Sequence, residues 1–160
     1  MYAQESSVCA LVDKYGVSER NICKFNESEF FIGDVTVVPE KLSHDVPCVG
    51  YSLVCEGKKI SIATDTGKLT DRTVTRFSDA DLVVLESNHD VDMLRDGPYP
   101  YDLKQRVASK RGHLSNCECA EFATELADHG TRAIMLAHLS KENNDPCLAL
   151  DETERAVSGL

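Results

Sequence analysis

The sequence lacks a long apolar run, a secretory leader pattern and an excess of basic charge. No apolar stretch among its 160 residues approaches the roughly 20 that a membrane helix requires, and residues 1–15 lack the charged-then-apolar order of a signal peptide. We therefore expect no membrane partner and a cytoplasmic location. The formal net charge of −10 argues against broad wrapping of nucleic acid, because such binding needs basic surface.

The cysteines do not form the pattern of a disulfide framework or a zinc knuckle. There are seven, an odd number, and they are scattered along the chain, which favours reduced thiols. Cys117 and Cys119 are the only close pair, but one residue separates them where a zinc knuckle has two, and no second pair follows. We interpret them as small residues lining a helix rather than as metal ligands.

The first half of the chain predicts a helix followed by antiparallel strands. Residues 5–16 begin with serines suited to capping and end at Gly16, which is typical of a helix. Residues 28–42 then predict two strands joined by a turn at Gly33-Asp34, and residues 49–64 predict two more with Gly57-Lys58 as the turn.

The second half alternates between strands and helices. Without internal repeats or low-complexity linkers, residues 1–160 are predicted to be one domain of the α/β (α+β) class, with sheets flanked by helices. The predicted helices are residues 70–78, 100–112, 115–130 and 145–160, and the predicted buried strands are residues 81–87 and 131–140.

Three polar residues stand where an apolar strand gives way to a loop: His44, Asp65 and His138. Loops at strand ends are where scaffolds display functional groups. Two histidines and a carboxylate suit zinc, manganese or iron, and one carboxylate can bridge two metal ions in a phosphoester-cleaving centre.

Ordinary structural roles remain open for each of these residues. A histidine in a loop often belongs to a turn, and an aspartate at a strand end often caps the next helix. Taken singly, each residue fits these roles better than metal binding, and the spacing alone does not decide. Asp65-Thr66-Gly67 also resembles the aspartic-protease turn, but the chain contains one such turn and the later alternation of strands and helices does not suit that fold.

Three segments in the same order resemble a known family. They are "TDTG", "LESNHDVDMLRDGPYPYDLKQRVASKRGHLSN" and "LAHLSKENNDP", and they are similar to the YycJ/WalJ-like branch of the metallo-β-lactamase-fold hydrolases. The likeness covers nearly the whole chain. It implies a partial metallo-β-lactamase fold, an αββα sandwich with a mixed sheet and outer helices, and a dinuclear metal centre that hydrolyses phosphodiester bonds in nucleic acid.

The resemblance also implies roles for individual residues. His44, Asp65 and His138 match the family's metal ligands, with Asp65 bridging two divalent ions (zinc, manganese or iron), His44 holding one ion and His138 the other. Water at that centre would be the nucleophile, activated by the metal charge. His113 would join Asp65 as a catalytic residue, since a helix N-terminus beside it favours a substrate phosphate.

The remaining polar residues offer further substrate contacts, each with a structural alternative. Asn88, His89, Ser115 and Asn116 would line the site or cap local turns. The basic cluster of Lys104, Arg106, Lys110 and Arg111 would contact phosphates or form a solvated helix face. Tyr99 and Tyr101 would stack on a base or, more typically, pack against the neighbouring prolines.

One departure from the family bears on completeness. The family's His-x-His-x-Asp-His motif is missing from this sequence, and with it four expected ligands. We therefore expect an incomplete domain, to be completed by a missing N-terminal segment or a homo-oligomer. The alternative is a non-catalytic fragment without a complete metal site, which would expose a large apolar surface where the first sheet should lie.

Overall fold

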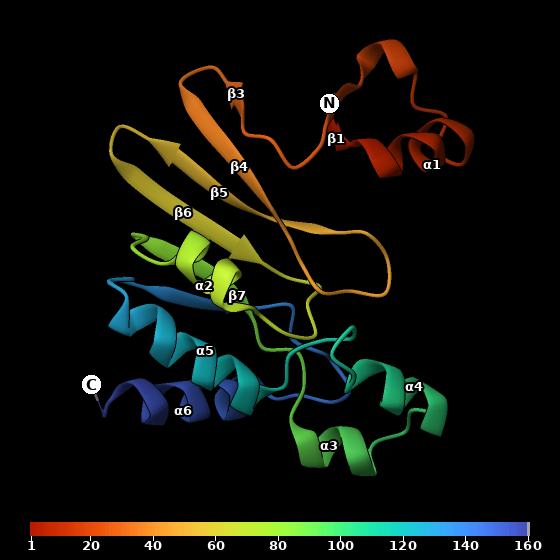
Figure 1. Cartoon of the computed structure of the whole chain (residues 1–160). Helices are drawn as coiled ribbons and strands as arrows, with labels where there is room; N and C mark the ends of the chain where they lie inside the picture. The colour runs from red at the N-terminus through yellow and green to blue at the C-terminus, as the bar shows by residue number, and fades with distance from the viewer. Residues whose placement is uncertain (160) are drawn as a thin grey trace.

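The computed structural model describes residues 1–159; Leu160, the last residue of the predicted helix 145–160, lies outside the described residues. Its central element is a six-stranded mixed sheet with the strand order β3-β4-β5-β6-β7-β8 (Figure 1). Strands β3 to β6 pair antiparallel, whereas β6, β7 and β8 are parallel. The strands are β3 Phe30–Ile32, β4 Val35–Lys41, β5 Val49–Cys55, β6 Lys58–Ala63, β7 Leu82–Glu86 and β8 Ile134–Ala137.

Both predicted hairpins form, and one turn lies a residue earlier than expected. Residues 33–34 join β3 to β4, as predicted. Between β5 and β6 the turn is Glu56-Gly57, because Lys58 already pairs with Cys55 in the ladder. Glu56 has a φ of 49° and Gly57 a φ of 73°. Two successive positive φ angles match the right-handed twist of a tight hairpin.

The predicted serine cap of the first helix does not form, because Ser7, which precedes Val8–Asp13, makes no capping side-chain hydrogen bond; two later helices do begin at side-chain caps. Thr70 accepts a hydrogen bond from the backbone N–H of Thr73, and Ser115 forms a capping box with Glu118. Two details differ: the short helix α3 was not predicted, and α4 ends before residue 112. The helices of the second half are α2 Asp71–Phe77, α3 Val91–Asp96, α4 Tyr101–Val107, α5 Asn116–Asp128 and α6 Pro146–Val157.

The main hydrophobic core lies between one face of the sheet and the helices. Val83 and Leu85 of β7 and Phe77 of α2 are wholly buried there, together with Leu126 of α5. Helix α6 packs against α5 (Figure 1). Burying side chains of this size typically contributes about 1.5–3 kcal/mol each to the free energy of folding. Packing on this face therefore stabilises the strands that end at the site described below.

The opposite face of the sheet has much less cover. The cross-strand neighbours Leu53, Ile60 and Leu82 lie on it, as do Val84 and Met135. Ile60 is 38% and Met135 54% exposed. Among the described residues, the second sheet consists of two short strands only. An exposed apolar face of this kind is typical of a surface that further protein structure covers.

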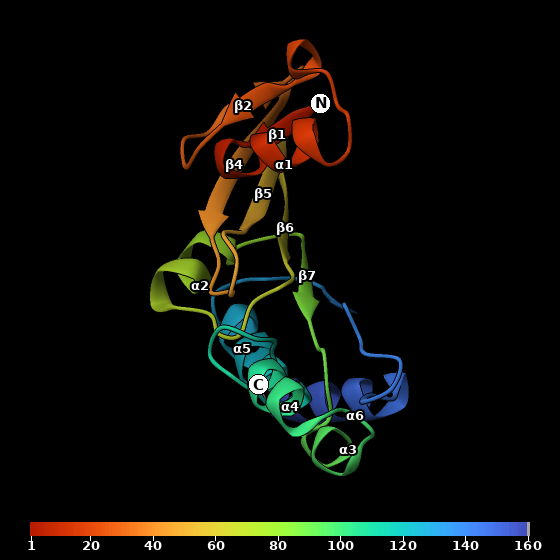
Figure 2. The ribbon, with the colours of Figure 1, turned by 90° about the vertical axis from the view of Figure 1, so that its right-hand side faces the viewer.

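The N-terminal segment forms a small unit of its own at one end of the molecule (Figures 1 and 2). Strands β1 (Tyr2–Gln4) and β2 (Cys23–Phe25) pair in parallel around helix α1 (Val8–Asp13). Phe25 joins this unit to the large sheet, because its ring stacks on Phe30 and meets Tyr51 edge-on. No helix in residues 1–159 is long and apolar enough to span a membrane.

Candidate metal centre

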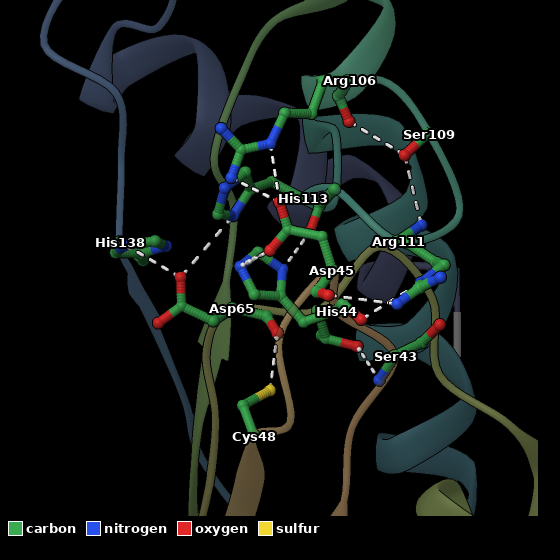
Figure 3. A network of polar contacts seen from close by, with 12 residues as sticks. Ser43, His44, Asp45, Cys48, Asp65, Arg106, Ser109, Arg111, His113 and His138 are labelled. Carbon is green, nitrogen blue, oxygen red and sulfur yellow. Dashed lines mark hydrogen bonds and ion pairs between the residues drawn. The ribbon is translucent and has the colours of Figure 1, made fainter. Parts of the chain in front are cut away.

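The three parallel strands bring polar residues to one edge of the sheet. Asp65 follows β6, Glu86 ends β7, and His138 follows β8, while His44 comes from the loop after β4. Figure 3 shows His44, Asp65, His113 and His138 converging there. Crevices outside the carboxyl ends of parallel strands are common ligand sites. Here the crevice has a volume of about 510 Å³.

The imidazole rings of His44, His113 and His138 form a row. The ring of His113 is centred 5.1 Å from that of His44 and 5.2 Å from that of His138. Nδ1 of His44 lies 3.0 Å from the carbonyl oxygen of Gly112. A carbonyl only accepts hydrogen bonds, so this nitrogen carries the proton and Nε2 of the neutral ring keeps its lone pair. Nε2 lies 3.2 Å from Oδ1 of Asp45, so a metal ion bound by this lone pair would lie beside that carboxylate.

Glu86 orients the other two histidines from beneath. Its side chain is wholly buried, and Oε1 lies 2.6 Å from Nδ1 of His113 and 2.8 Å from Nδ1 of His138. Oε2 accepts the backbone N–H of Thr66 at 2.8 Å. In each neutral ring the proton therefore sits on Nδ1, which leaves Nε2 free. Metal-binding histidines are typically held in this way by a carboxylate or a carbonyl.

The hydrogen bonds around Glu86 also shift the pKa values of this carboxyl and of His138. Burial opposes ionisation of Glu86, but the hydrogen bonds from His113, His138 and Thr66 outweigh it and hold the pKa of this carboxyl below its usual value. The hydrogen bond to Glu86 raises the pKa of His138, against the opposing effect of burial. The buried carboxylate is therefore charged, and a positive charge above it is favoured.

Asp65 is the second carboxylate beside His113 and His138. Its Oδ1 lies 3.7 Å from Nε2 of His138 and 3.9 Å from Nδ1 of His113, and its side chain is 46% exposed (Figure 3). Asp65 has a φ of 59° and His138 a φ of 58°. Left-handed backbone in non-glycine residues costs about 1 kcal/mol or more, and two of the four such residues in the described part of the chain lie at this centre.

The Asp-Thr-Gly turn is held by contacts distant in sequence. The backbone N–H of Gly67 donates to the carbonyl of Ser43 at 2.8 Å. A Cβ on Gly67 would lie 2.5 Å from the carbonyl carbon of Lys110 and closer still to the carbonyl oxygen of Ser109. The glycine thus lets the segment before His113 pack directly on the turn that carries Asp65.

The donor set fits a divalent metal ion. Ligand atoms of His44, Asp65 and His113 lie within 4.8 Å of one another, and so do those of Glu86, His113 and His138. In the second group the short contacts of Glu86 are hydrogen bonds to Nδ1 atoms, so Glu86 acts as a support of the ligands. Imidazole nitrogen with a carboxylate oxygen suits zinc, manganese and iron.

The substrate-contact candidates divide between this crevice and another. Asn88 and Arg106 line the metal crevice, together with Tyr99. Asn88 donates to the carbonyl of His138 at 2.9 Å, and Nε of Arg106 donates to Asp45 at 2.6 Å. The remaining candidates lie elsewhere: His89, Lys104 and Ser115 line a second cavity, and Asn116 is buried between Ser87 and Asn144.

Glu86 is not among the site residues predicted from the sequence. Its only signal was a charged residue ending the otherwise apolar run "LVVLE", where a buried carboxylate needs partners.

Known proteins resemble this chain in sequence and in structure. No family model matches. "Exodeoxyribonuclease WalJ" of Streptococcus pneumoniae is 37% identical over 150 residues, which cover 90% of this chain and 55% of the relative. "Exodeoxyribonuclease YycJ" of Bacillus anthracis is 39% identical over 113 residues, which cover 70% of this chain and 43% of the relative. The chain therefore spans about half the length of the curated relatives it matches.

Two solved structures resemble the fold over almost the entire chain. The metallo-β-lactamase fold protein YhfI of Bacillus subtilis matches with a TM-score of 0.74 at 18% identity, covering 98% of this chain and 58% of YhfI. This chain is a relative of WalJ and YycJ and has the metallo-β-lactamase fold. Zn²⁺-bound PqqB of Methylobacterium extorquens matches with a TM-score of 0.68 at 17% identity, covering 99% of this chain and 59% of PqqB. The predicted resemblance and fold class are thus confirmed.

Proposed function

We propose that this chain carries the centre of a metal-dependent hydrolase that cleaves phosphodiester bonds in nucleic acid. The observation that carries the proposal is the convergence of three imidazoles and Asp65 on one crevice, with Nδ1 of each ring bonded to Gly112 or Glu86. The names of the WalJ and YycJ relatives, both exodeoxyribonucleases, support DNA as the substrate.

His44, Asp65 and His138 are the proposed metal ligands. Nε2 of His44 lies 3.2 Å from Oδ1 of Asp45, and Nε2 of His138 lies 3.7 Å from Oδ1 of Asp65, so these two ring nitrogens are the ones that would bind metal. Asp65 would bridge two divalent ions, with His44 holding one and His138 the other. Divalent ions at such a site neutralise phosphate charge and activate water.

His113 is the proposed catalytic partner of Asp65. Its Nδ1 is held by Glu86 at 2.6 Å, so Nε2 is the nitrogen available to a substrate oxygen. The ring lies between those of His44 and His138, next to the proposed ligands. It accepts a proton when neutral and donates one when protonated.

Arg106, Asn88 and Lys141 line the crevice and are the proposed contacts to the phosphate backbone. The chain has a net charge of −10, so attraction of nucleic acid has to be local. Arg106 is paired with Asp45, which fixes its position at the rim while also reducing its net field. Lys141 is exposed and offers an ammonium group to a phosphate.

Hydrolysis of single-stranded DNA labelled at one end tests the proposal. The purified chain is assayed with Mn²⁺ or Zn²⁺ beside Asp65→Asn and His129→Asn. His129 is an exposed histidine that ends α5, away from the crevice, with its Nδ1 bonded to the carbonyl of Glu125. We expect metal-dependent cleavage by the unchanged chain and by His129→Asn, and none by Asp65→Asn. Equal cleavage by both variants would refute the assignment.

A second candidate is a non-catalytic chain that pairs through its open sheet face. The exposure of Ile60 and Met135 on that face favours it. Light scattering decides between the two: this candidate requires a dimer or larger assembly that Met135→Lys dissociates, without metal-dependent cleavage. A monomer that cleaves DNA contradicts it.

A further inference from the structure

A second cavity lies on the other side of α4 from the metal crevice. Its volume is about 600 Å³, and it is enclosed by α3, α4 and the start of α5. Much of its wall is apolar, with Leu94 and Ala108 among the lining residues. A cavity of this size is within the range of small-molecule sites.

An imidazole with an unsatisfied nitrogen forms part of the wall. His89 is 2% exposed, and its Nδ1 is buried without a hydrogen-bond partner. Burial lowers the pKa of His89, so the ring is neutral and offers one donor and one acceptor. A buried polar atom without a partner is unfavourable, and His89 lines the cavity, so a ligand whose polar edge reached this nitrogen after a small rotation of the ring would relieve that cost.

The mouth of the cavity carries an aromatic ring and a cation. Tyr101 lines it and is 74% exposed, so the ring is available for stacking. Nζ of Lys104 donates to the carbonyl of Arg95 at 2.6 Å, which leaves two ammonium hydrogens for a ligand. Arg95 is paired with both Asp92 and Asp96, so the charge of Lys104 offsets the second of these carboxylates.

The metal crevice and the second cavity are lined by neighbouring residues of the same two segments. Asn88 lines the metal crevice, whereas the next residue, His89, lines the second cavity. Helix α4 presents Arg106 and Val107 to the crevice, and Lys104 and Ala108 to the cavity. A DNA strand with a phosphate in the metal crevice and a base in the second cavity would have to cross only helix α4.

We infer that the second cavity binds a nucleobase of the DNA strand whose phosphate reaches the metal crevice. This inference rests on the proposed function. The apolar walls and Tyr101 accept the flat faces of the base, His89 bonds its polar edge, and Lys104 contacts the adjoining phosphate. Stacking on an aromatic ring tolerates any base, so the cavity positions the strand without selecting a sequence.

Nuclear magnetic resonance titration in the presence of EDTA tests the cavity without hydrolysis. The probes are dAMP and, as a matched ligand without a base, deoxyribose 5-phosphate. We expect dAMP to shift the backbone amide signals of His89, Tyr101 and Ala108, and deoxyribose 5-phosphate to leave them unchanged. Equal shifts from both probes, shifts confined to the metal crevice, or no shifts at millimolar concentration would overturn the inference.

Two variants and one control give the test a quantitative readout. Ala108→Trp fills the cavity from an exposed position at the end of α4 and should abolish the dAMP shifts. Tyr101→Ala should weaken dAMP binding by about tenfold, the fold-change expected for loss of one stacking contact. Tyr15→Ala, at another exposed tyrosine, should bind as the unchanged chain does. Unaltered affinity in Ala108→Trp would place the base elsewhere.

The cleavage assay separates failure of this inference from failure of the proposed function. Metal-dependent DNA cleavage without dAMP shifts at His89 overturns the base site alone. Shifts at His89 that Ala108→Trp abolishes, in a chain without cleavage, support the base site and overturn the hydrolase proposal.

Discussion

Oε1 of Glu86 lies 2.8 Å from Nδ1 of His138. This contact ties the end of β7 to the loop after β8, and it turns the free nitrogen of His138 toward Asp65, 3.7 Å away. The carboxylate is wholly buried, so a large desolvation cost is offset by the hydrogen bonds that it accepts. The arrangement is understandable if the histidine has to be held in one orientation and one tautomer.

Replacing Glu86 with glutamine should lower the affinity for metal while the chain stays folded. Glu86→Gln keeps the shape but removes the charge that holds the proton on Nδ1 of His113 and His138. Loss of such a support typically lowers metal affinity 10–100-fold. Calorimetric titration with Zn²⁺ measures this.

Glu40→Gln is the matched control for Glu86→Gln. Glu40 is also buried, at 4% exposure, but it pairs with Arg72 of α2 on the helix-covered side of the sheet. The Glu40→Gln variant should have a changed melting temperature and an unchanged Zn²⁺ affinity. If both variants bind Zn²⁺ equally well, Glu86 does not orient metal ligands.

Gly67→Ala should disturb the site through a steric clash. The added methyl group would meet the backbone of Ser109 and Lys110, forcing the segment before His113 away from Asp65. Overpacking of this kind costs about 1–3 kcal/mol. Urea unfolding and Zn²⁺ titration should both show a loss.

Gly159→Ala provides the comparison, because its new Cβ has only the carbonyl of Ala156 nearby, at 3.8 Å. A Gly67→Ala variant as stable as Gly159→Ala would show that residues 109–111 do not pack tightly on the turn.

Asp81 should make the stability of the fold depend on acid pH. The hydrogen bond from Lys58, with further ones from the Lys59 N–H and Arg132, lowers the pKa of Asp81 from 3.8 to about 2. A lowered pKa means that the stabilisation is present above pH 3.8 and is lost as the pH falls toward 2.

The unchanged chain should therefore exceed Asp81→Asn in unfolding free energy at pH 6, with the difference shrinking between pH 4 and pH 2. Urea unfolding across this range measures it. Asp13→Asn, at an exposed aspartate that ends α1, controls for general charge effects. A difference between Asp81→Asn and the unchanged chain that stays constant with pH would rule out the linkage.

Local signals in the sequence predict much of the fold. Ser115, Thr70 and the apolar runs of β5 to β8 mark their elements because capping and strand formation depend on neighbouring residues. The three-residue strands β1 and β2 and the six-residue helix α3 escape prediction, since so short a segment carries too little periodicity. Residues 108–112 do not extend α4, because Gly112 packs against the carbonyls of Arg106 and Val107.

Only part of the candidate site can be predicted from the sequence. His44, Asp65 and His138 are visible as polar residues after apolar strands, but their convergence depends on the strand order. Glu86 is hidden, because its role requires His113 and His138 to meet above it from distant positions. The second cavity could not be predicted for the same reason. His89 and Lys104 line it together, but they are distant in sequence and no local pattern indicates that they share a cavity.

The most direct test of the account is calorimetric titration of the purified, metal-free chain with Zn²⁺ and with Mn²⁺, beside Asp65→Asn and His129→Asn. We predict that the unchanged chain and His129→Asn bind metal with the same affinity and stoichiometry, and that Asp65→Asn loses binding. Equal metal binding by the Asp65 and His129 variants would contradict the claim that Asp65 and the histidines around it form a metal centre.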